Sequence, residues 1–178
     1  MLLEGLITSK TRNKLLLKFF INPDTISYLR QLSDEFNEST NSVRLELNSL
    51  TNAKILVKEK AGNTIAYRAN QEHPFFKDIQ NIIFKSIGID KVISSIIENI
   101  GGPELIILTG DYANGIDSGI IDIVVVGNLD KTKFEKYVNS AEKLINRKVR
   151  YLIIDKEDFA KLKDKFKKDG MLILWEQD

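Results

Sequence analysis

The sequence predicts a mixed α/β protein of two domains, with helices and a short hairpin first and alternating strands and helices afterwards. Three observations support this fold class. Apolar residues recur at helical spacing over residues 11–51, β-branched residues flank a glycine within 54–68, and strongly apolar segments of strand length lie at 105–108 and 121–126. The chain has 178 residues, 43% of them hydrophobic, which is enough for two small cores.

Three helices are predicted in the N-terminal segment, at residues 11–20, 27–36 and 40–51. Ser9 and Thr40 are the expected N-caps of the first and third, because their hydroxyl oxygens can accept from free backbone N–H groups. A short polar turn separates the second helix from the third. The third helix carries one apolar stripe at positions i, i+4 and i+7, formed by Val43, Leu47 and Leu50.

Two short strands are expected after the third helix, at residues 54–58 and 64–68. Gly62 lies between them and can adopt the positive φ that a tight hairpin turn requires. The resulting order of helix, helix, turn, helix and hairpin is that of a winged helix-turn-helix domain.

Four segments of this region also resemble the ArsR-like family of prokaryotic transcriptional regulators, whose members often carry a nucleotidyltransferase-like domain after the winged helix. These segments are residues 9–20, 28–32, 43–50 and 67–74. The resemblance implies a winged-helix domain over residues 1–74 that binds double-stranded DNA. It also implies a transcriptional regulator of the cytoplasm that works as a homodimer.

In a winged helix the third helix enters the major groove, so its polar face supplies base contacts and the hairpin supplies phosphate contacts. The expected helix residues are Asn41, Ser42, Arg44 and Asn48, and the expected hairpin residues are Lys58, Lys60, Asn63 and Arg68. A solvated polar face or a protein-interaction module is the competing interpretation. Leu45, exposed on this arrangement, would meet either a thymine methyl group or a protein partner.

Acidic residues near this surface oppose phosphate binding, so the sequence predicts modest affinity for non-specific DNA. They are Glu38, Glu46 and Glu59. Residues 75–100 are expected to form two amphipathic connecting helices that take part in a dimer or pack on the second domain. The single histidine, His73, precedes a proline in a turn and is interpreted as structural, not as a metal ligand.

The C-terminal domain is predicted over residues 101–178. Strands are expected at 105–108, 121–126 and 149–154, a helix at 131–145, and a further helix that Asp155 begins. This strand-loop-strand-helix-strand order suits a small mixed sheet.

The segment 108–126 resembles the minimal nucleotidyltransferase motif, in which a Gly-Ser loop precedes a strand with Asp-x-Asp. Gly110 and Gly115 match the loop glycines, and Tyr112 matches the pattern. Asp111 stands where the family has serine, and Asp122 is the second aspartate of the pair. The resemblance implies a vestigial nucleotide site at Gly110, Asp111, Tyr112, Gly115 and Asp122.

The chemistry of that family requires two divalent cations held by carboxylates. Ile120 occupies the first ligand position, and a hydrocarbon side chain cannot coordinate Mg²⁺. The third carboxylate would fall at Arg150 or Leu152, neither of which is acidic. We therefore expect no catalytic residues, no metal and no cofactor. A substitute cation site at Asp111, Asp117 and Asp122 is the alternative.

Net charge is +1, which excludes a uniformly basic protein but allows a basic face. There is no cysteine, so disulfides and thiolate metal sites are excluded, and no apolar segment approaches the length of a membrane span. The leading prediction is a DNA-binding transcriptional regulator with a catalytically dead second domain that senses, dimerises or binds a protein partner. The alternative is an active nucleotidyltransferase, or an antitoxin-like component, whose winged helix serves autoregulation.

Overall fold

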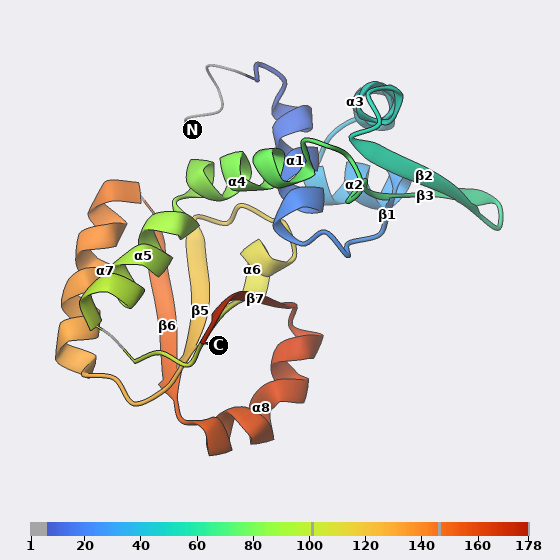
Figure 1. The fold of residues 1–178 in the computed structure, drawn as a ribbon. Coiled ribbons are helices and arrows are strands. Elements are labelled where there is room, and N and C mark those ends of the chain that lie inside the picture. Colours follow the sequence, from blue (N-terminus) through green and yellow to red (C-terminus); the bar gives the residue numbers. More distant parts are fainter. Residues whose placement is uncertain (1–6, 101, 146, 178) are drawn as a thin grey trace. The chain divides into compact units, whose positions relative to one another are not determined.

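The computed structural model of the chain describes residues 7–100, 102–145 and 147–177. These residues form eight α-helices and two β-sheets, so the predicted mixed α/β class is confirmed (Figure 1). The chain divides into two compact units, Met1–Ser86 and Ile87–Asp178. The division falls inside the connecting helices expected over residues 75–100.

Three helices build the first unit: α1 (Lys10–Ile21), α2 (Leu29–Phe36) and α3 (Thr40–Asn52). The predicted cap of α1 is confirmed, because Ser9 Oγ accepts from the Arg12 N–H at 3.2 Å. The cap of α3 lies one residue before the prediction. There Ser39 Oγ, not Thr40, accepts from the Ser42 N–H at 3.1 Å.

A small antiparallel sheet completes this unit, with the strand order β1-β3-β2. Its strands are β1 (Ser27–Tyr28), β2 (Leu56–Ala61) and β3 (Thr64–Ala69). The prediction of helix at residues 27–28 is wrong, because these residues pair with Tyr67 and Ala66 of β3 and tertiary pairing overrides the helical pattern.

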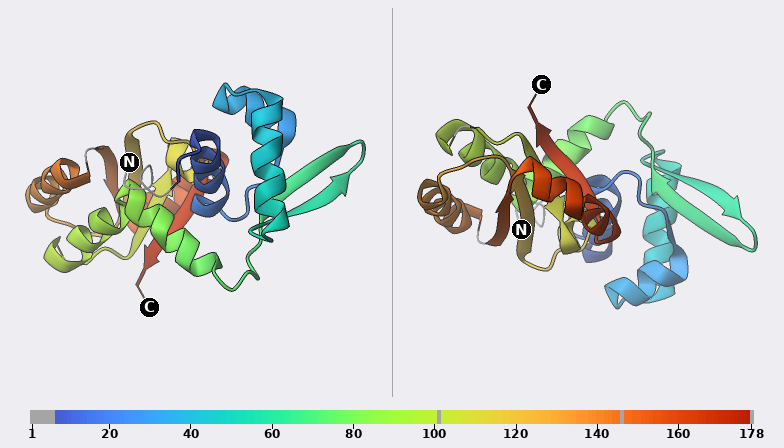
Figure 2. Two further views of the ribbon diagram at one scale, coloured as in Figure 1. Left: turned by 90° about the horizontal axis from the view of Figure 1, so that it is seen from above. Right: turned by 90° about the horizontal axis from the view of Figure 1, so that it is seen from below.

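Strand β2 begins two residues later than predicted, because Lys54 has φ +59°, a left-handed conformation that ends α3 and excludes Lys54 from the strand. Gly62 takes φ +60° in the turn, as expected. The β2–β3 hairpin projects away from the helices of its unit (Figure 2).

The core of the first unit lies between the helices and the base of the hairpin. Leu15, Phe19, Leu32, Val43, Leu47 and Leu56 are at most 1% exposed. Helix α4 (Phe76–Ile87) joins this core, since the ring of Phe76 lies 5.4 Å from that of Phe20 and Gln80 Nε2 donates to the Phe20 carbonyl at 3.1 Å.

A four-stranded sheet with the order β6-β5-β4-β7 forms the centre of the second unit. Its strands are β4 (Leu105–Thr109), β5 (Ile120–Val126), β6 (Lys148–Ile154) and β7 (Met171–Glu176). Strands β5 and β6 are parallel and the other pairs antiparallel, so the predicted mixed sheet is confirmed. Strand β7 was not predicted.

Helices cover both faces of this sheet (Figure 1). On one face lie α5 (Ile89–Ile100) and α7 (Lys131–Ile145), where the ring of Phe134 is 4.7 Å from that of Tyr151. On the other face α8 (Lys156–Lys168) packs Phe159 and Phe166 against apolar residues of β4 and β5.

Gly88 marks a close approach between α5 and α7. It has φ +82°, and a Cβ there would lie 2.4 Å from Ile145 Cγ2, so only glycine fits. Across the described ranges no helix combines the length and the apolarity needed to span a membrane.

Candidate functional sites

The outward face of α3 carries exposed polar side chains around one exposed leucine, Leu45. Because Val43 and Leu47 are completely buried, the helical period turns Asn41, Arg44 and Asn48 away from the core, and all three are exposed. Within the described part of the chain none of these three side chains forms a hydrogen bond or ion pair. They are therefore available to an external ligand.

Ser42, the fourth residue expected on this face, lies elsewhere. Its Oγ is 3.1 Å from Thr11 Oγ1, and the pair is partly buried between α1 and α3. Ser42 therefore connects two helices, and the structure does not group it with Asn41, Arg44 and Asn48.

The β2–β3 hairpin has two different faces. Directly paired residues point to the same side, so Lys58 shares a face with Tyr67, and Lys60 shares it with Ile65. Lys58 and Lys60 are exposed and form no ion pair among the described residues. Asn63 is exposed in the turn beside them.

The charge of Arg44 on α3 reaches the hairpin. Burial raises the pKa of Tyr67, and the positive charge of Arg44 acts on this phenol in the opposite direction. Tyr67 pairs in register with Lys58 and shares its face of the hairpin. The exposed amides of Asn41 and Asn48 belong to the same helix face as Arg44.

The acidic residues expected to oppose DNA are all ion-paired. Glu46 Oε2 accepts from Arg12 Nε at 2.7 Å, and Arg12 also donates to Ser49 Oγ at 3.2 Å. Sequence reasoning missed this role of Arg12, which only the packing of α1 on α3 reveals. The two other pairs are Glu38–Lys14 at 3.2 Å and Glu59–Arg68 at 2.7 Å.

Arg68 does not lie with the other expected hairpin residues. Its side chain is on the hairpin face of Val57 and Glu59, opposite to that of Lys58, and both its Nε and Nη2 donate to Glu59. Of the eight expected DNA-contacting residues, six are exposed and have side chains without hydrogen bonds or ion pairs among the described residues, whereas Ser42 and Arg68 bind other partners.

In the second unit, strand alternation places Ile120 and Asp122 on one face of β5, as predicted. Asp122 pairs in register with Thr109 of β4 and Arg150 of β6. The guanidinium of Arg150 binds both carboxylate oxygens of Asp122, with Nη2 2.9 Å from Oδ2 and Nε bonded to Oδ1. An arginine whose side chain is 73% exposed is therefore ion-paired with the one carboxylate that remains on this face of β5.

Gly110 fits closely against the same carboxylate. It has φ +67°, and a Cβ at this position would lie 2.6 Å from Asp122 Oδ2. Gly110 begins the short helix α6 (Gly110–Ala113), a segment that the sequence analysis treated as loop. Asp111 is exposed, and its charge adds to the larger effect of Asp122 in raising the pKa of Arg150.

Tyr112 points into the protein interior, not toward a ligand. It is fully buried, its hydroxyl donates to the Asp117 carboxylate, and it accepts from Arg147 Nε at 2.7 Å. Arg147 Nη2 also donates to Asp117 Oδ2 at 2.9 Å. Burial is the first cause of the raised pKa of Tyr112, and the hydrogen bond to Asp117 is the second.

The same triad determines the state of Asp117. Burial alone would raise the pKa of this carboxyl, but hydrogen bonds from Arg147 and Tyr112 outweigh burial and lower it. Asp117 and Asp122 are therefore both engaged with arginines, although the sequence allowed them in a substitute cation site. Among the residues that the structure describes, no cluster of three or more acidic or histidine side chains is arranged to hold a metal ion.

Two further residues of the motif, Asn114 and Gly115, determine the backbone at the end of α6. Gly115 is buried with φ +73°. Asn114 stands where the resemblance expects a basic residue, and its Nδ2 donates to the carbonyls of Gly110 at 2.9 Å and Asp169 at 3.0 Å. Asn114 thus ties α6 to the segment that precedes β7.

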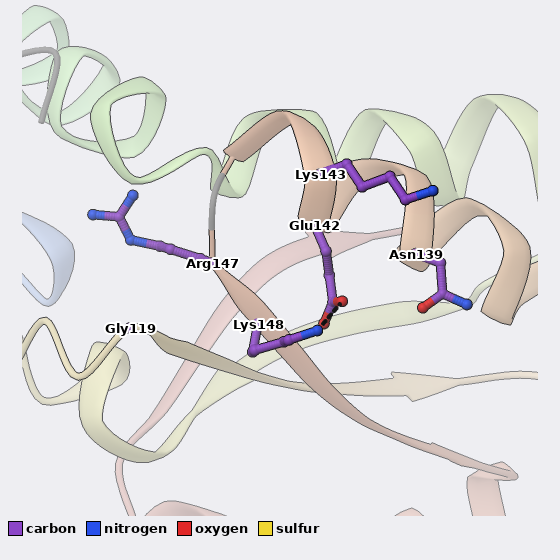
Figure 3. Close-up of a pocket in the computed structure, with 6 residues that line it drawn as sticks. All are labelled: Gly119, Asn139, Glu142, Lys143, Arg147 and Lys148. Carbon is purple, nitrogen blue, oxygen red and sulfur yellow. Dashed lines mark hydrogen bonds and ion pairs between the residues drawn. The ribbon is translucent and has the colours of Figure 1, made fainter.

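A pocket of about 590 Å³ lies at the end of α7, and none of the expected site residues lines it. Glu142 accepts from Lys148 Nζ at 3.0 Å and from the Val149 N–H at 2.7 Å, so its charge is already satisfied. Figure 3 shows Arg147 directed away from the other labelled side chains. The lining residues are Gly119, Asn139, Glu142, Lys143, Arg147 and Lys148.

His73 has a local role, as expected. Its ring Nδ1 accepts from the backbone N–H of Phe75 at 3.2 Å, and the backbone N–H of His73 donates to the Asn70 carbonyl at 3.1 Å. Both bonds hold the turn before α4.

Comparison with known proteins gives little that bears on function. No protein-family model matches the chain, and no curated protein matches it. The fold search finds a likeness to the structure of a mutant of Lactococcus lactis ZitR, with 15% sequence identity and a TM-score of 0.32. The match covers 51% of this chain and 70% of that one. A likeness this weak carries no argument about function.

Proposed function

We propose that this chain is a DNA-binding transcriptional regulator whose winged-helix domain, residues 1–74, recognises double-stranded DNA. The observation that carries the proposal is the distribution of charge on the first unit. Arg44, Lys58 and Lys60 are exposed and have no counterions in the described part of the chain, while Glu46 and Glu59 are ion-paired.

The two groups of residues suit the two kinds of DNA contact. Arg44 can bind the O6 and N7 atoms of guanine, and the amides of Asn41 and Asn48 suit the N6 and N7 atoms of adenine. Lys58, Lys60 and the turn residue Asn63 suit phosphates, which orient a protein on DNA without reading sequence.

The proposed role of the C-terminal domain, residues 101–178, is non-catalytic: it senses a signal, contributes to a homodimer or binds a protein partner. The ion pair between Asp122 and Arg150 supports this proposal, since a guanidinium lies on the carboxylate that a metal would need. The hydrocarbon side chain of Ile120 supplies no ligand beside it.

An active nucleotidyltransferase is the second candidate. The close fit of Gly110 against Asp122 favours it, because the first glycine of the motif and its second aspartate lie in direct contact. Incubation of the full chain with Mg²⁺ and each nucleoside triphosphate separates the two proposals. We expect no pyrophosphate, and metal-dependent release abolished by Asp122→Asn would establish the enzyme instead.

Selection of bound sequences from a random duplex pool tests the DNA proposal directly. We expect the full chain to enrich a two-fold-related motif and Arg44→Ala to weaken binding to it by about 1–3 kcal/mol. Lys136→Ala, which removes one exposed charge from α7, is the control and should bind normally. If no duplex is retained at low salt, the DNA-binding proposal fails.

A further inference from the structure

Leu45 is an unusual residue for the face on which it lies. Its side chain is 62% exposed in the middle of α3, on the side opposite the buried stripe of Val43 and Leu47. Because Leu45 is exposed, it contributes little to the core of the first unit. Packing therefore does not explain an apolar residue at this position of α3.

The neighbours of Leu45 define what can contact it. Asn41, Leu45 and Asn48 follow one another at i, i+4 and i+7, so they form one row along the helix surface. An apolar side chain therefore stands between two carboxamides, and Arg44 is adjacent to it in the chain.

This row is complementary to A·T base pairs in the major groove. Adenine presents N6 and N7 to a carboxamide, and its partner thymine presents a C5-methyl group that favours apolar contact. We propose that Leu45 is a specificity-determining residue that packs against a thymine methyl group, and that the bound sequence has A·T pairs where the centre of α3 meets the groove. The inference rests on the proposed DNA-binding function.

A protein partner explains Leu45 less well. Surfaces that dock proteins present contiguous apolar area, whereas the adjacent exposed positions of α3 are the polar residues Asn41, Arg44, Asn48 and Ser49. Arg44, Lys58 and Lys60 are exposed and form no ion pair among the described residues, which favours an anionic partner. Along α3, Leu45 is a single exposed apolar side chain among polar and cationic groups, which matches a base edge better than an apolar protein surface.

Thymidine and deoxyuridine differ only by this C5-methyl group, so replacing one with the other tests the contact directly. In the duplex obtained by selection with the full chain, each thymine is replaced in turn by deoxyuridine, and the Kd is measured for wild type and for Leu45→Ala. At one or two positions per half-site, we expect uracil to weaken wild-type binding about fourfold, the value for burial of one methyl group. Leu45→Ala should be insensitive to the same replacement.

Leu144→Ala is the matched control, because Leu144 is a 70% exposed leucine on α7. This variant should keep the wild-type sensitivity to uracil. The inference is overturned if wild type binds all uracil duplexes equally, or if Leu45→Ala loses as much affinity as wild type at the same positions. Failure to bind any duplex would refute the DNA-binding function as well, whereas sequence-selective binding without methyl dependence would refute the role of Leu45 alone.

Discussion

At the scale of single residues, arginines bind two of the three aspartates that the sequence allowed in a substitute cation site. Arg150 binds Asp122, and Arg147 binds Asp117 together with the hydroxyl of Tyr112. The sequence identified position 150 as a place where a carboxylate was missing. It did not reveal the ion pair, because strand register decides which side chain faces Asp122.

The triad of Tyr112, Asp117 and Arg147 is the more buried of the two arrangements. The side chains of Arg147 and Asp117 are 12% and 23% exposed, so removal of the cation leaves a carboxylate with little access to water. Because water still reaches part of Asp117, we expect Arg147→Ala to lower the free energy of unfolding by about 1.5 kcal/mol, less than for a fully buried pair. Lys148→Ala, next in the chain but 78% exposed, should change it by less than about 1 kcal/mol.

Urea unfolding as a function of pH checks the cause of this loss. The pKa of Asp117 is lowered in the folded state, so its contribution to stability is present above the unfolded pKa of about 3.9 and is lost as pH falls through the folded value. The difference in the free energy of unfolding between wild type and Arg147→Ala should therefore be constant near neutral pH and shrink below about pH 4. A difference independent of pH would show that lost packing, not charge, is responsible.

At the scale of elements, the hairpin is the clearest case of two faces whose charged side chains differ in their partners. Lys58 and Lys60 lie on the face near Arg44, whereas Arg68 lies on the opposite face and is bound to Glu59. Each phosphate contact contributes about 0.9 to the slope of log K against log salt concentration. We expect the double variant Lys58→Ala with Lys60→Ala to make this negative slope shallower by about 2.

Arg68→Ala provides the comparison on the same hairpin. Because Glu59 already binds this guanidinium, we expect the salt slope to stay within about 0.5 of the wild-type value. Titration of a labelled duplex at several salt concentrations measures all three slopes. If Arg68→Ala made the salt slope shallower by as much as the double lysine variant, both faces of the hairpin would contact DNA.

Most elements were predictable because their apolar residues follow a regular period. The helices α1, α3, α4 and α7 and the strands β4, β5 and β6 lie within two residues of their expected bounds. What escaped prediction depends on partners distant in the chain. Strand β1 forms because β3 lies beside it, and β7 pairs with β4 across more than sixty residues.

The candidate DNA interface was predictable for the same reason. The stripe of α3 fixes which face is buried, so Asn41, Arg44 and Asn48 had to be exposed. The exceptions, Ser42 and Arg68, depend on Thr11 and Glu59, whose positions the helical or strand period does not determine. Periodicity predicts which face a residue occupies, but not which residue of another element it binds.

At the scale of the whole molecule, the remaining question is how one small recognition helix would achieve useful affinity. A chain with net charge +1 gains little from overall attraction to DNA. Two copies on a two-fold-related site would double the phosphate and base contacts. The proposed homodimer would therefore compensate for the weakness of a single α3–hairpin surface.

Helix α4 carries the residues that suit such a dimer. Phe75, immediately before it, and Ile82 within it are 64% and 49% exposed, and their spacing of seven residues places them on one side. We expect Ile82→Asp to convert a dimer into a monomer in light scattering, and to weaken binding to a two-fold-related duplex while leaving binding to a single half-site unchanged. Leu144→Asp places the same charge on an exposed leucine of α7. If that variant dissociates the dimer while Ile82→Asp does not, the interface belongs to the C-terminal domain, and the proposed role of that domain becomes dimerisation.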